Sequence, residues 1–353
     1  MTKIFATGTT GYIGGDALYA ISTAHPEYEI AALVRSTEKG ARIAKQYPSV
    51  RLVYGGLDDV ALIEKEASEA DIVLHFAHAD HEPSALAISK GLAARSQSRP
   101  GFFIHTSGTG ILTFEDLQAG TFGIAFRDKV YNDLEGIKEV TSLPDAAIHR
   151  NVDKIVLEAG TTFPSRVKTA IVCPPTIYGI GRGPDSQRSI QLPELCRLSL
   201  IEGQAIMVNQ GLTYWGHVHI QDLSALYLKL TEEAAAGGVK DDAWGTEGYY
   251  FCENGEHVWG EVSQWVADQG KMSGYFKSSE VKSLTAEEAS ERRFHGQGLW
   301  GANSRARAKR AREVLDWQPT AAKFKDEVET TLDFEAELLG LRTGLAKVAD
   351  SNK

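Results

Sequence analysis

Hydrophobic residues in the first half of the chain form short continuous runs, separated by stretches with helical spacing. Apolar runs predict six strands, at residues 3–7, 28–35, 50–54, 71–77, 101–107 and 167–172. Helical spacing predicts helices from residue 12 to about 25, and at 37–47, 60–70, 83–95 and 151–160. Strands of continuous hydrophobicity that alternate with helices indicate an α/β fold, a Rossmann doubly wound parallel sheet with helices on both faces.

Beyond residue 178 the pattern becomes mixed. It predicts helices near 192–202, 222–233 and 258–269, strands near 205–208 and 248–252, and a last amphipathic helix over 325–347, with an apolar stripe of Val328, Leu332, Leu339 and Leu345. The basic segment 303–315 is interpreted as a helix with a solvated face. We therefore expect two parts: residues 1–178 as a dinucleotide-binding Rossmann domain, and residues 179–353 as a smaller α/β substrate lobe interleaved with it.

Residues 108–148 interrupt the alternation with a polar, turn-rich stretch. A connection of this length inside a compact domain usually carries function. It leaves the edge of the sheet where ligands bind, so we expect it to form part of the substrate pocket. A surface insertion is the alternative.

The first strand is followed at once by glycines at positions 8, 11 and 14. A strand, a glycine turn and a helix form the geometry that holds a pyrophosphate. Gly8 permits the tight turn, Gly11 allows the backbone to approach the phosphates, and Gly14 allows the helix to pack on the strand. We interpret this stretch as a dinucleotide site.

Composition and charge narrow the function classes. The 353 residues are 42% hydrophobic and 24% charged, with a net charge of -10, which argues against a nucleic-acid-binding surface. Cys173, Cys196 and Cys252 show no metal or redox spacing, so we expect reduced thiols and no metal site. No apolar run approaches the ~20 residues of a membrane span, and the first strand leaves no room for a signal peptide. The expectation is a soluble cytoplasmic protein without a nucleic-acid or membrane partner.

Several motifs in sequence order resemble the extended, or atypical, short-chain dehydrogenase/reductase superfamily, which includes NAD-dependent epimerase/dehydratase-like and NmrA-like proteins. Its cofactor fingerprint is similar to residues 7–14, and its later landmarks are similar to residues 219–223 and 315–319. The resemblance extends from residue 3 to about 320. It implies a set of cofactor-contacting positions: Gly8, Thr10, Gly11, Tyr12, Ile13, Leu57, Asp58, Phe76, Ala77, His78, Thr106, Lys154, Pro174, Thr176 and Ile177.

The end of the second strand bears on cofactor preference. NAD sites usually place an acidic residue there, which binds the ribose diol. This chain has Arg35 and Ser36 instead. Because a guanidinium forms bidentate bonds to a phosphate, we predict NADP(H), with a solvated surface arginine as the alternative.

The catalytic centre departs from the family, whose members pair a Tyr with a Lys four residues later. Lys154 matches that lysine, which would bind the nicotinamide ribose, but Arg150 stands where the Tyr belongs. The family's serine falls near Gly108, between Ser107 and Thr109. Arginine cannot donate a proton, although it can hold an anion or polarise a carbonyl.

Other proton donors remain open. His149 titrates near neutrality and is a candidate general acid, although a histidine beside a helix start is more often structural. Tyr131, Tyr178 and Tyr214 are further candidates that spacing does not rank.

These residues favour an NADP(H)-dependent reductase of a small organic carbonyl or imine with a non-standard proton donor, and an imine that is already protonated needs no tyrosine. The alternatives are an NADP(H)-binding sensor without turnover and a cofactor-binding isomerase or cyclase. The missing Tyr favours the sensor, whereas Lys154 and the long loop favour the enzyme.

The family also implies an assembly. Its helices near 83–95 and 151–160 often pair across a two-fold axis, and both segments carry apolar residues here: Ala85, Leu86, Ile88, Leu92, Val152, Ile155 and Val156. We expect a homodimer.

Overall fold

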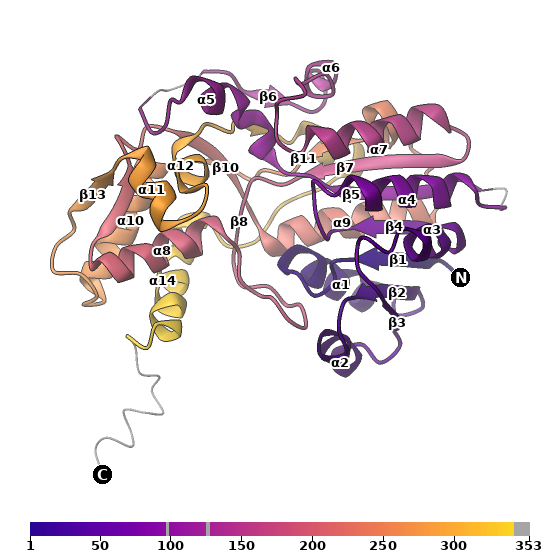
Figure 1. Ribbon diagram of the computed structural model, residues 1–353, viewed down its shortest axis with the longest axis horizontal. Helices are drawn as coiled ribbons and strands as arrows, with labels where there is room; N and C mark the ends of the chain where they lie inside the picture. The colour runs from indigo at the N-terminus through magenta and orange to yellow at the C-terminus, as the bar shows by residue number, and fades with distance from the viewer. Residues whose placement is uncertain (97–98, 125–127, 342–353) are drawn as a thin grey trace, which may run out of the picture.

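A seven-stranded parallel sheet forms the centre of the molecule (Figure 1). The computed structural model describes residues 1–96, 99–124 and 128–341. In spatial order the strands are β11 (Tyr249–Phe251), β7 (Val167–Cys173), β5 (Gly101–Thr106), β4 (Ile72–His75), β1 (Lys3–Thr7), β2 (Glu29–Val34) and β3 (Arg51–Tyr54). The predicted Rossmann sheet is confirmed. The expectation that residues 167–172 complete the sheet is wrong, because β11 adds a parallel strand beside β7.

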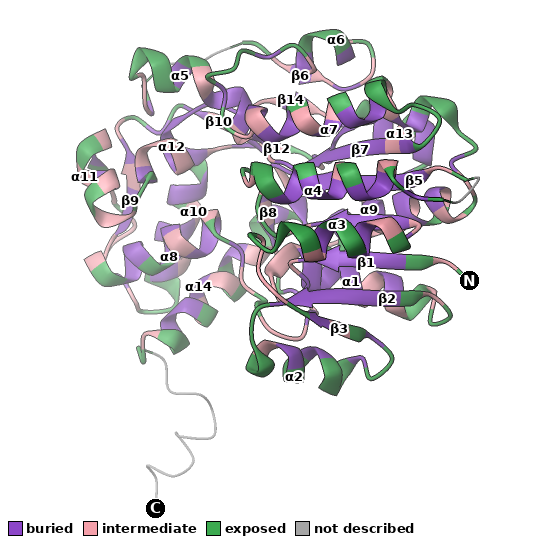
Figure 2. Cartoon of the chain, turned by 45° about the vertical axis from the view of Figure 1, so that its right-hand side comes forward, coloured by how far each residue is buried: buried purple, intermediate pink, exposed green. Residues whose placement is uncertain are grey.

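Helices cover both faces of this sheet. Successive right-handed crossovers from β1 to β2 to β3 place two helices on one face, and the return from β3 to β4 places the next on the other. One face carries α1 (Tyr12–Ala24), α2 (Thr37–Gln46) and α9 (Ile220–Ala235), which packs on α1. The other carries α3 (Val60–Glu69), α4 (Glu82–Ala93) and α7 (Arg150–Thr162), which pack side by side (Figure 2). The buried apolar residues of both layers form one continuous core with the strands.

A smaller lobe lies at the carboxyl ends of the strands and has a core of its own. Its helices are α8 (Gln191–Glu202), α10 (Trp259–Met272), α11 (Ala286–Arg292), α12 (Gly296–Gly301) and α14 (Glu327–Leu338). Its strands are β9 (Ala205–Val208) with β13 (Val281–Leu284), and β12 (Glu256–Val258), β10 (Tyr214–His219) and β8 (Thr176–Tyr178). Because α9 and β11 return to the Rossmann core, residues 179–353 contribute to both parts.

Short elements connect these parts. They are η1 (Thr109–Thr113), α5 (Phe114–Ala119), β6 (Tyr131–Asn132), α6 (Ile137–Val140), η2 (Asp241–Ala243), η3 (Gly245–Glu247), β14 (Ala306–Arg307), α13 (Lys309–Leu315) and η4 (Phe324–Asp326). In the predicted last helix, Val328 and Leu332 are buried as expected, whereas Leu345 lies outside the described residues.

The interpretation of residues 303–315 as one solvated basic helix is wrong. Only the second half is helical, and β14 pairs with β6 before it. Two of the cations are largely shielded from solvent and pair with carboxylates: Arg305 binds Glu256 at 2.7 Å, and the buried Arg310 binds Glu247 at 2.7 Å. The carboxylates come from segments distant in sequence, so the run of basic residues alone could not reveal the pairing.

The long segment 108–148 is built into the body. Its buried Asp116 accepts hydrogen bonds from the backbone and side chain of Asn303. Its buried Asp133 accepts backbone hydrogen bonds from Phe251, Lys309 and Arg310, at 2.8–2.9 Å. Burial nevertheless raises the pKa of Asp133 to about 7. These contacts join the segment to β11 and to the start of α13, so it is not a loose surface insertion.

The structure also bears on the expected cysteine state, membrane spans and apolar helix faces. The three cysteines are free and buried. Among the described helices, none combines the length and apolar character of a membrane span. In the proposed dimer helices, Ala85, Ile88 and Val156 face the protein's own core, as do Leu92 and Val152, and only Leu86 is well exposed. Their apolar spacing therefore reflects packing on the sheet.

Candidate cofactor and active site

The turn between β1 and α1 has the shape expected of a pyrophosphate site. Gly8 has φ +75°, and a Cβ there would lie 2.7 Å from the backbone of Ala77, so the turn packs tightly against the end of β4. A Cβ on Gly11 would meet only the Gly8 carbonyl oxygen, at 3.1 Å, and space beyond it is open. Since the first N–H groups of α1, from Tyr12 and Ile13 onward, lack partners within the helix, this cradle fits a diphosphate.

The end of β2 offers a free cation. Arg35 is exposed, and its side chain has no hydrogen bond or ion pair within the described parts of the chain. Ser36 caps α2 by accepting a hydrogen bond from the Lys39 N–H at 3.3 Å. After β3, Leu57 is half-buried and the exposed Asp58 contacts His81 at 3.2 Å. These positions are accessible in the structure, and their contact with an adenosine moiety stays a prediction.

The predicted cofactor-contacting positions after β4 and at the end of β5 differ in how accessible they are to a ligand. Phe76 packs edge-on against Tyr227, while Ala77 and His78 are exposed. The Thr106 hydroxyl is buried and lies 2.6 Å from the Tyr227 hydroxyl, on the α9 side of the sheet. Ala77 and His78 are thus accessible to a cofactor, whereas the Thr106 side chain is engaged with α9.

The positions after β7 hold neighbouring elements in place. The Pro174 carbonyl accepts a hydrogen bond from the Thr109 N–H at 2.9 Å. The buried Thr176 donates to the Gln191 side chain at 2.9 Å, and Ile177 is half-buried on β8. Thr10 contributes its carbonyl oxygen to a hydrogen bond from the Ser186 N–H at 3.2 Å.

His149 lies at the end of β5 and is oriented by a carboxylate. Its backbone has φ 68° at the start of α7, and its Nδ1 lies 2.8 Å from Asp80 Oδ1. A Cβ built on Gly108 would lie 3.3 Å from His149 Nε2, so the ring packs directly against the position to which the resemblance assigns the family's serine. The hydrogen bond to His149 lowers the pKa of Asp80. An imidazole held by a carboxylate at one nitrogen can exchange a proton at the other.

Arg150 and Lys154 are engaged with the long segment. Arg150 is buried and donates to the backbone carbonyls of Leu143 (3.0 Å) and Thr141 (2.7 Å), and its Nη1 has no partner among the residues described. Lys154 is exposed and pairs with the exposed Asp145 at 2.8 Å. Because this face of α7 meets the turn 141–145, both residues would have to release or share these contacts to bind a ligand.

The hydroxyls beside Gly108 are buried. Ser107 lies next to Asp153. Asp153 Oδ2 accepts a hydrogen bond from the Tyr249 hydroxyl at 2.9 Å. Burial raises the pKa of Asp153 to about 6, against the opposing effect of the Tyr249 and Ser107 hydroxyls. Thr109 Oγ1 is buried without a hydrogen-bond partner in the described structure. The Asp153 carboxyl on α7 and the Ser107 and Thr109 hydroxyls after β5 are therefore all buried.

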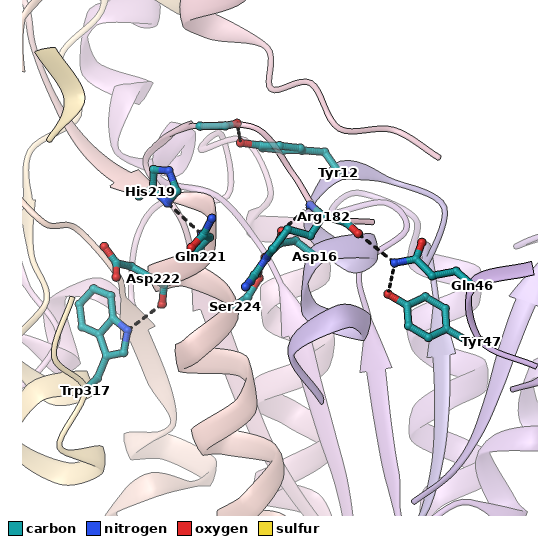
Figure 3. A network of polar contacts seen from close by, with 11 residues as sticks. Tyr12, Asp16, Gln46, Tyr47, Arg182, His219, Gln221, Asp222, Ser224 and Trp317 are labelled. Atoms are coloured by element: carbon teal, nitrogen blue, oxygen red, sulfur yellow. Dashed lines mark hydrogen bonds and ion pairs between the residues drawn. The ribbon is translucent and has the colours of Figure 1, made fainter. Parts of the chain in front are cut away.

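A segment that the sequence did not single out borders the glycine turn. We call residues 179–189 the strap. Tyr12 donates its hydroxyl proton to the Gly179 carbonyl at 2.6 Å, so its phenol is not free for catalysis (Figure 3). Arg182 forms an ion pair with the fully buried Asp16 of α1 at 2.6 Å, and Asp16 also accepts from Ser224 of α9.

The strap also reaches α2. The Arg182 carbonyl accepts a hydrogen bond from Gln46 at 3.2 Å (Figure 3), and Asp185 pairs with Arg42 and lies 3.8 Å from Lys39. One signal for this contact was present in the sequence. Asp16 is a carboxylate inside the apolar stripe of α1, and such a residue requires a buried partner.

The family landmarks in the second half of the chain meet one another. Trp317 donates its indole N–H to the Asp222 carbonyl at 2.8 Å, and the Asp222 side chain accepts from the Thr320 N–H (Figure 3 shows the Trp317 bond). His219 accepts a hydrogen bond from the Gln221 N–H at the start of α9. These landmarks hold α9 and the chain after α13 together.

Comparison with known proteins gives full-length relatives. The oxidase ucsJ of Acremonium sp is 43% identical over 345 residues, which cover 96% of this chain and 99% of that protein. An uncharacterized protein of Saccharomyces cerevisiae is 26% identical over 336 residues, covering 92% of this chain and 97% of its own length. No model of a protein family matches the chain.

Solved structures share the fold at low sequence identity. The dTDP-glucose 4,6-dehydratase DesIV of Streptomyces venezuelae, solved with NAD and TYD bound, has a TM-score of 0.66 at 16% identity, over 96% of this chain and 98% of that chain. The UDP-glucuronic acid 4-epimerase of Bacillus cereus, solved with NAD, has a TM-score of 0.64 at 16% identity, over 96% and 99%. This likeness extends over both lobes.

Proposed function

Because the chain belongs to the extended short-chain dehydrogenase/reductase superfamily, with the fold of its NAD-dependent epimerase/dehydratase-like enzymes, we propose that it is an NADP(H)-dependent reductase of a small organic carbonyl or imine. In this proposal the His149–Asp80 pair replaces the family's tyrosine as proton donor. The observation that supports this most is the position of His149: its Nε2 lies 3.3 Å from where a Cβ on Gly108 would stand, and its Nδ1 is held by Asp80 at 2.8 Å. The name of the 43% identical relative, an oxidase, supports redox chemistry.

Each group has a distinct task in this proposal. The glycine turn holds the diphosphate, and the bound NADPH supplies the hydride. Protonated His149 donates its Nδ1 proton in a hydrogen bond to Asp80 and gives the Nε2 proton to the substrate oxygen or nitrogen as the hydride reaches carbon. Asp80 remains ionised and stabilises the imidazolium. The Ser107 and Thr109 hydroxyls, which are buried in this conformation, would have to become accessible to orient the substrate.

The choice of NADP(H) rests on Arg35. The solved neighbours carry NAD, which shows that this fold accommodates a nicotinamide dinucleotide. In this chain the end of β2 presents an exposed guanidinium without a partner among the described side chains, and a 2′-phosphate would give it one.

A sensor without turnover is the second candidate. It is favoured by the engagement of Lys154 with Asp145 and of Arg150 with backbone carbonyls, since neither residue is free to act on a substrate in this conformation. An isomerase or cyclase would use the same cofactor without net hydride loss.

A panel of carbonyl and imine compounds, assayed by the absorbance of NADPH, separates these candidates. The reductase predicts NADPH consumption with at least one compound and its loss in the His149→Ala variant. No consumption across the panel, together with an NADPH-dependent change in affinity for a protein partner, would contradict the reductase and support the sensor. Light scattering at micromolar concentration tests the proposed homodimer.

A further inference from the structure

Two histidines interrupt the apolar interior of neighbouring strands. His75 ends β4 and His105 lies near the end of β5, paired across the strands, and both side chains have 0% exposure. Their Nδ1 atoms are 2.9 Å apart. Burial lowers the pKa of His75 to about 3 and holds that of His105 well below its usual value, so both rings are neutral near pH 7. Neutral imidazoles can each accept a proton at one nitrogen and release one at the other.

A continuous series of contacts runs from these rings to the surface. His75 Nε2 lies 3.2 Å from the buried Ser84 hydroxyl of α4, and that hydroxyl lies 3.0 Å from His81 Nδ1. His81 Nε2 lies 3.2 Å from Oδ1 of Asp58, which is 95% exposed. Every step is within or near hydrogen-bond distance.

The inner end of the series faces the buried carboxyl of Asp153. His105 Nε2 lies 3.9 Å from Asp153 Oδ1, and neither atom has a hydrogen-bond partner within the described structure. Both side chains are fully buried. A shift of about 1 Å would close this gap to a hydrogen bond. Beyond Asp153 lies Ser107, at the end of β5 where the proposed substrate site begins.

We propose that His105, His75, Ser84 and His81 form a proton relay between the buried Asp153 and solvent at Asp58. Its part in turnover rests on the proposed function, because hydride transfer to a carbonyl or imine takes up one proton and the reverse reaction releases one. The path itself does not depend on that function. These residues do not contact substrate, and they act through Asp153 and Ser107.

The hydrogen-bond donors give the relay a direction. The Ser84 backbone N–H donates to His81 Nδ1 at 3.2 Å, so that nitrogen is an acceptor and His81 carries its proton on Nε2. The Ser84 hydroxyl lies 3.0 Å from both the His81 carbonyl oxygen, to which it donates, and His81 Nδ1, so its proton can turn between these two acceptors while its oxygen accepts from His75 Nε2–H. His75 Nδ1 then accepts from His105 Nδ1–H. His105 Nε2 is left as an acceptor that faces Asp153.

One proton moves outward through this arrangement without change in the net charge of any carrier, while His105, His75 and His81 each switch to the other tautomer. Protonated Asp153 gives its proton to His105 Nε2, His105 passes its Nδ1 proton to His75, and His75 passes its Nε2 proton to Ser84. Ser84 then gives its hydroxyl proton to His81 Nδ1, and His81 releases the Nε2 proton to Asp58 or water. Reversal of the tautomers and of the hydroxyl carries a proton inward, as the reductive direction requires.

Several charged or titratable groups face the ends of this path. Around Asp153 they are Tyr249 of β11, Cys173 of β7, His105 of β5, and His149 and Arg150 of α7. Around His75 they are His78, His81 and His105. The relay thus begins at the ring nitrogen that lies at ion-pair distance from Asp153, His105 Nε2 at 3.9 Å.

Exchange of the His105 ring proton with solvent tests the path without a substrate. Nitrogen-15 NMR of histidine-labelled full-length protein measures this exchange, and the His105 backbone amide reports opening of the core. In the wild type the ring proton should exchange much faster than the amide. In Ser84→Ala the ring exchange should slow by roughly tenfold or more, because it must then await opening of the core, while the amide rate stays the same.

Two further variants control this experiment. Ser84→Thr keeps the hydroxyl and should retain fast ring exchange, whereas Ser22→Ala removes a buried hydroxyl of α1 outside the relay and should change nothing. The melting temperature of each variant verifies folding. Equal ring exchange in the wild type and Ser84→Ala, or ring and amide rates that change together, would overturn the relay.

Turnover supplies the second readout. With a substrate from the panel, Ser84→Ala should lower the rate at saturating NADPH and alter the solvent deuterium isotope effect and the pH profile. A fast, Ser84-dependent ring exchange in a protein that consumes no NADPH would retain the path and overturn the proposed function. Turnover and isotope effect unchanged in Ser84→Ala would overturn the role of the path in catalysis.

Discussion

At the residue scale, the candidate site contains side chains that are free for a ligand and side chains already engaged with the fold. Arg35 belongs to the first group, whereas Arg150, Thr106 and Lys154 have protein partners. Their positions in the sequence motifs suggested all four as site residues but could not show which side chains are free and which are engaged with the fold. Their partners, such as Asp145 and Tyr227, are set by tertiary packing that spacing does not encode.

Arg35→Ala should weaken NADPH binding by roughly 10- to 100-fold, the loss expected for charge-assisted hydrogen bonds to a phosphate. NADH binding should remain nearly unchanged, because NADH has no 2′-phosphate. Calorimetric titration of both cofactors measures the difference, with Lys45→Ala on α2 as a matched loss of positive charge. A wild-type protein that prefers NADH would show that Arg35 has another role.

Lys154 and Asp145 form an exposed ion pair. Variants of these two residues distinguish a lysine that binds the cofactor from one that serves only the ion pair. If Lys154 leaves Asp145 to bind the nicotinamide ribose, Lys154→Ala should weaken NADPH binding by roughly tenfold. Asp145→Ala should leave it equal or tighter, because it frees the lysine. Fluorescence titration of the two variants measures this contrast. Equal affinities in both variants and the wild type would assign Lys154 to the surface pair alone.

At the element scale, the strap is the feature that motif reasoning missed. Pro174, Thr176 and Ile177 before it were assigned to the cofactor, but nothing in residues 179–189 indicated contacts with α1 and α2. Those contacts depend on Asp16 and Asp185, whose partners lie far away in sequence. The helix after the strap, α8, was predicted because its periodicity is local, whereas the three-residue strand β8 before it was not predicted.

Arg182→Ala should destabilise the fold and loosen the strap. Asp16 is fully buried, and loss of the guanidinium leaves its charge with only the Ser224 hydroxyl and the backbone N–H of residue 182. We expect a loss of about 2–3 kcal/mol in the free energy of unfolding, measured by urea denaturation.

Asp16→Asn in the Arg182→Ala background should recover part of this stability, since it removes the uncompensated charge. Glu38→Gln, which alters an exposed partner of Arg42, should leave the denaturation midpoint unchanged. An Arg182→Ala variant with wild-type stability would contradict the role assigned to this pair.

At the scale of the whole molecule, the Rossmann core followed from sequence because its strands are continuous hydrophobic runs. The return of β11 to the sheet did not, because a three-residue strand carries little periodicity and its pairing with β7 bridges about 80 intervening residues, a contact of high sequence separation. The buried histidines of β4 and β5 were visible in the sequence as polar residues at strand ends, but their mutual contact required the parallel register.

Buried neutral histidines should make the fold sensitive to acid. Burial lowers the pKa of His75 to about 3 and of His217 to about 4, and it holds the pKa values of His105 and His257 well below their usual value. In the unfolded chain these histidine side chains have their ordinary pKa near 6.5 and take up protons below it, whereas in the folded protein they stay neutral. The stability that they contribute is therefore present above pH 6.5 and is lost as the pH falls toward 4.

Asp133 and Asp153 oppose part of this loss, because their folded pKa values are raised, to about 7 and about 6. Urea midpoints between pH 7 and pH 4.5 measure the balance. His257→Phe should reduce the slope by up to about 1.4 kcal/mol per pH unit, the contribution of one group. Stability that stays level or rises on acidification would contradict the assignment of these rings as neutral.

The most direct test of the account is the turnover of His149→Ala at saturating NADPH, on a substrate found in the carbonyl and imine panel. His25→Ala, which alters a histidine at the far end of α1 that pairs with Glu27 and Glu232, is the matched control. We expect His149→Ala to lower turnover by roughly 10²- to 10⁴-fold with unchanged NADPH affinity, and His25→Ala to leave turnover unchanged. Turnover of His149→Ala equal to that of the wild type would contradict the central claim.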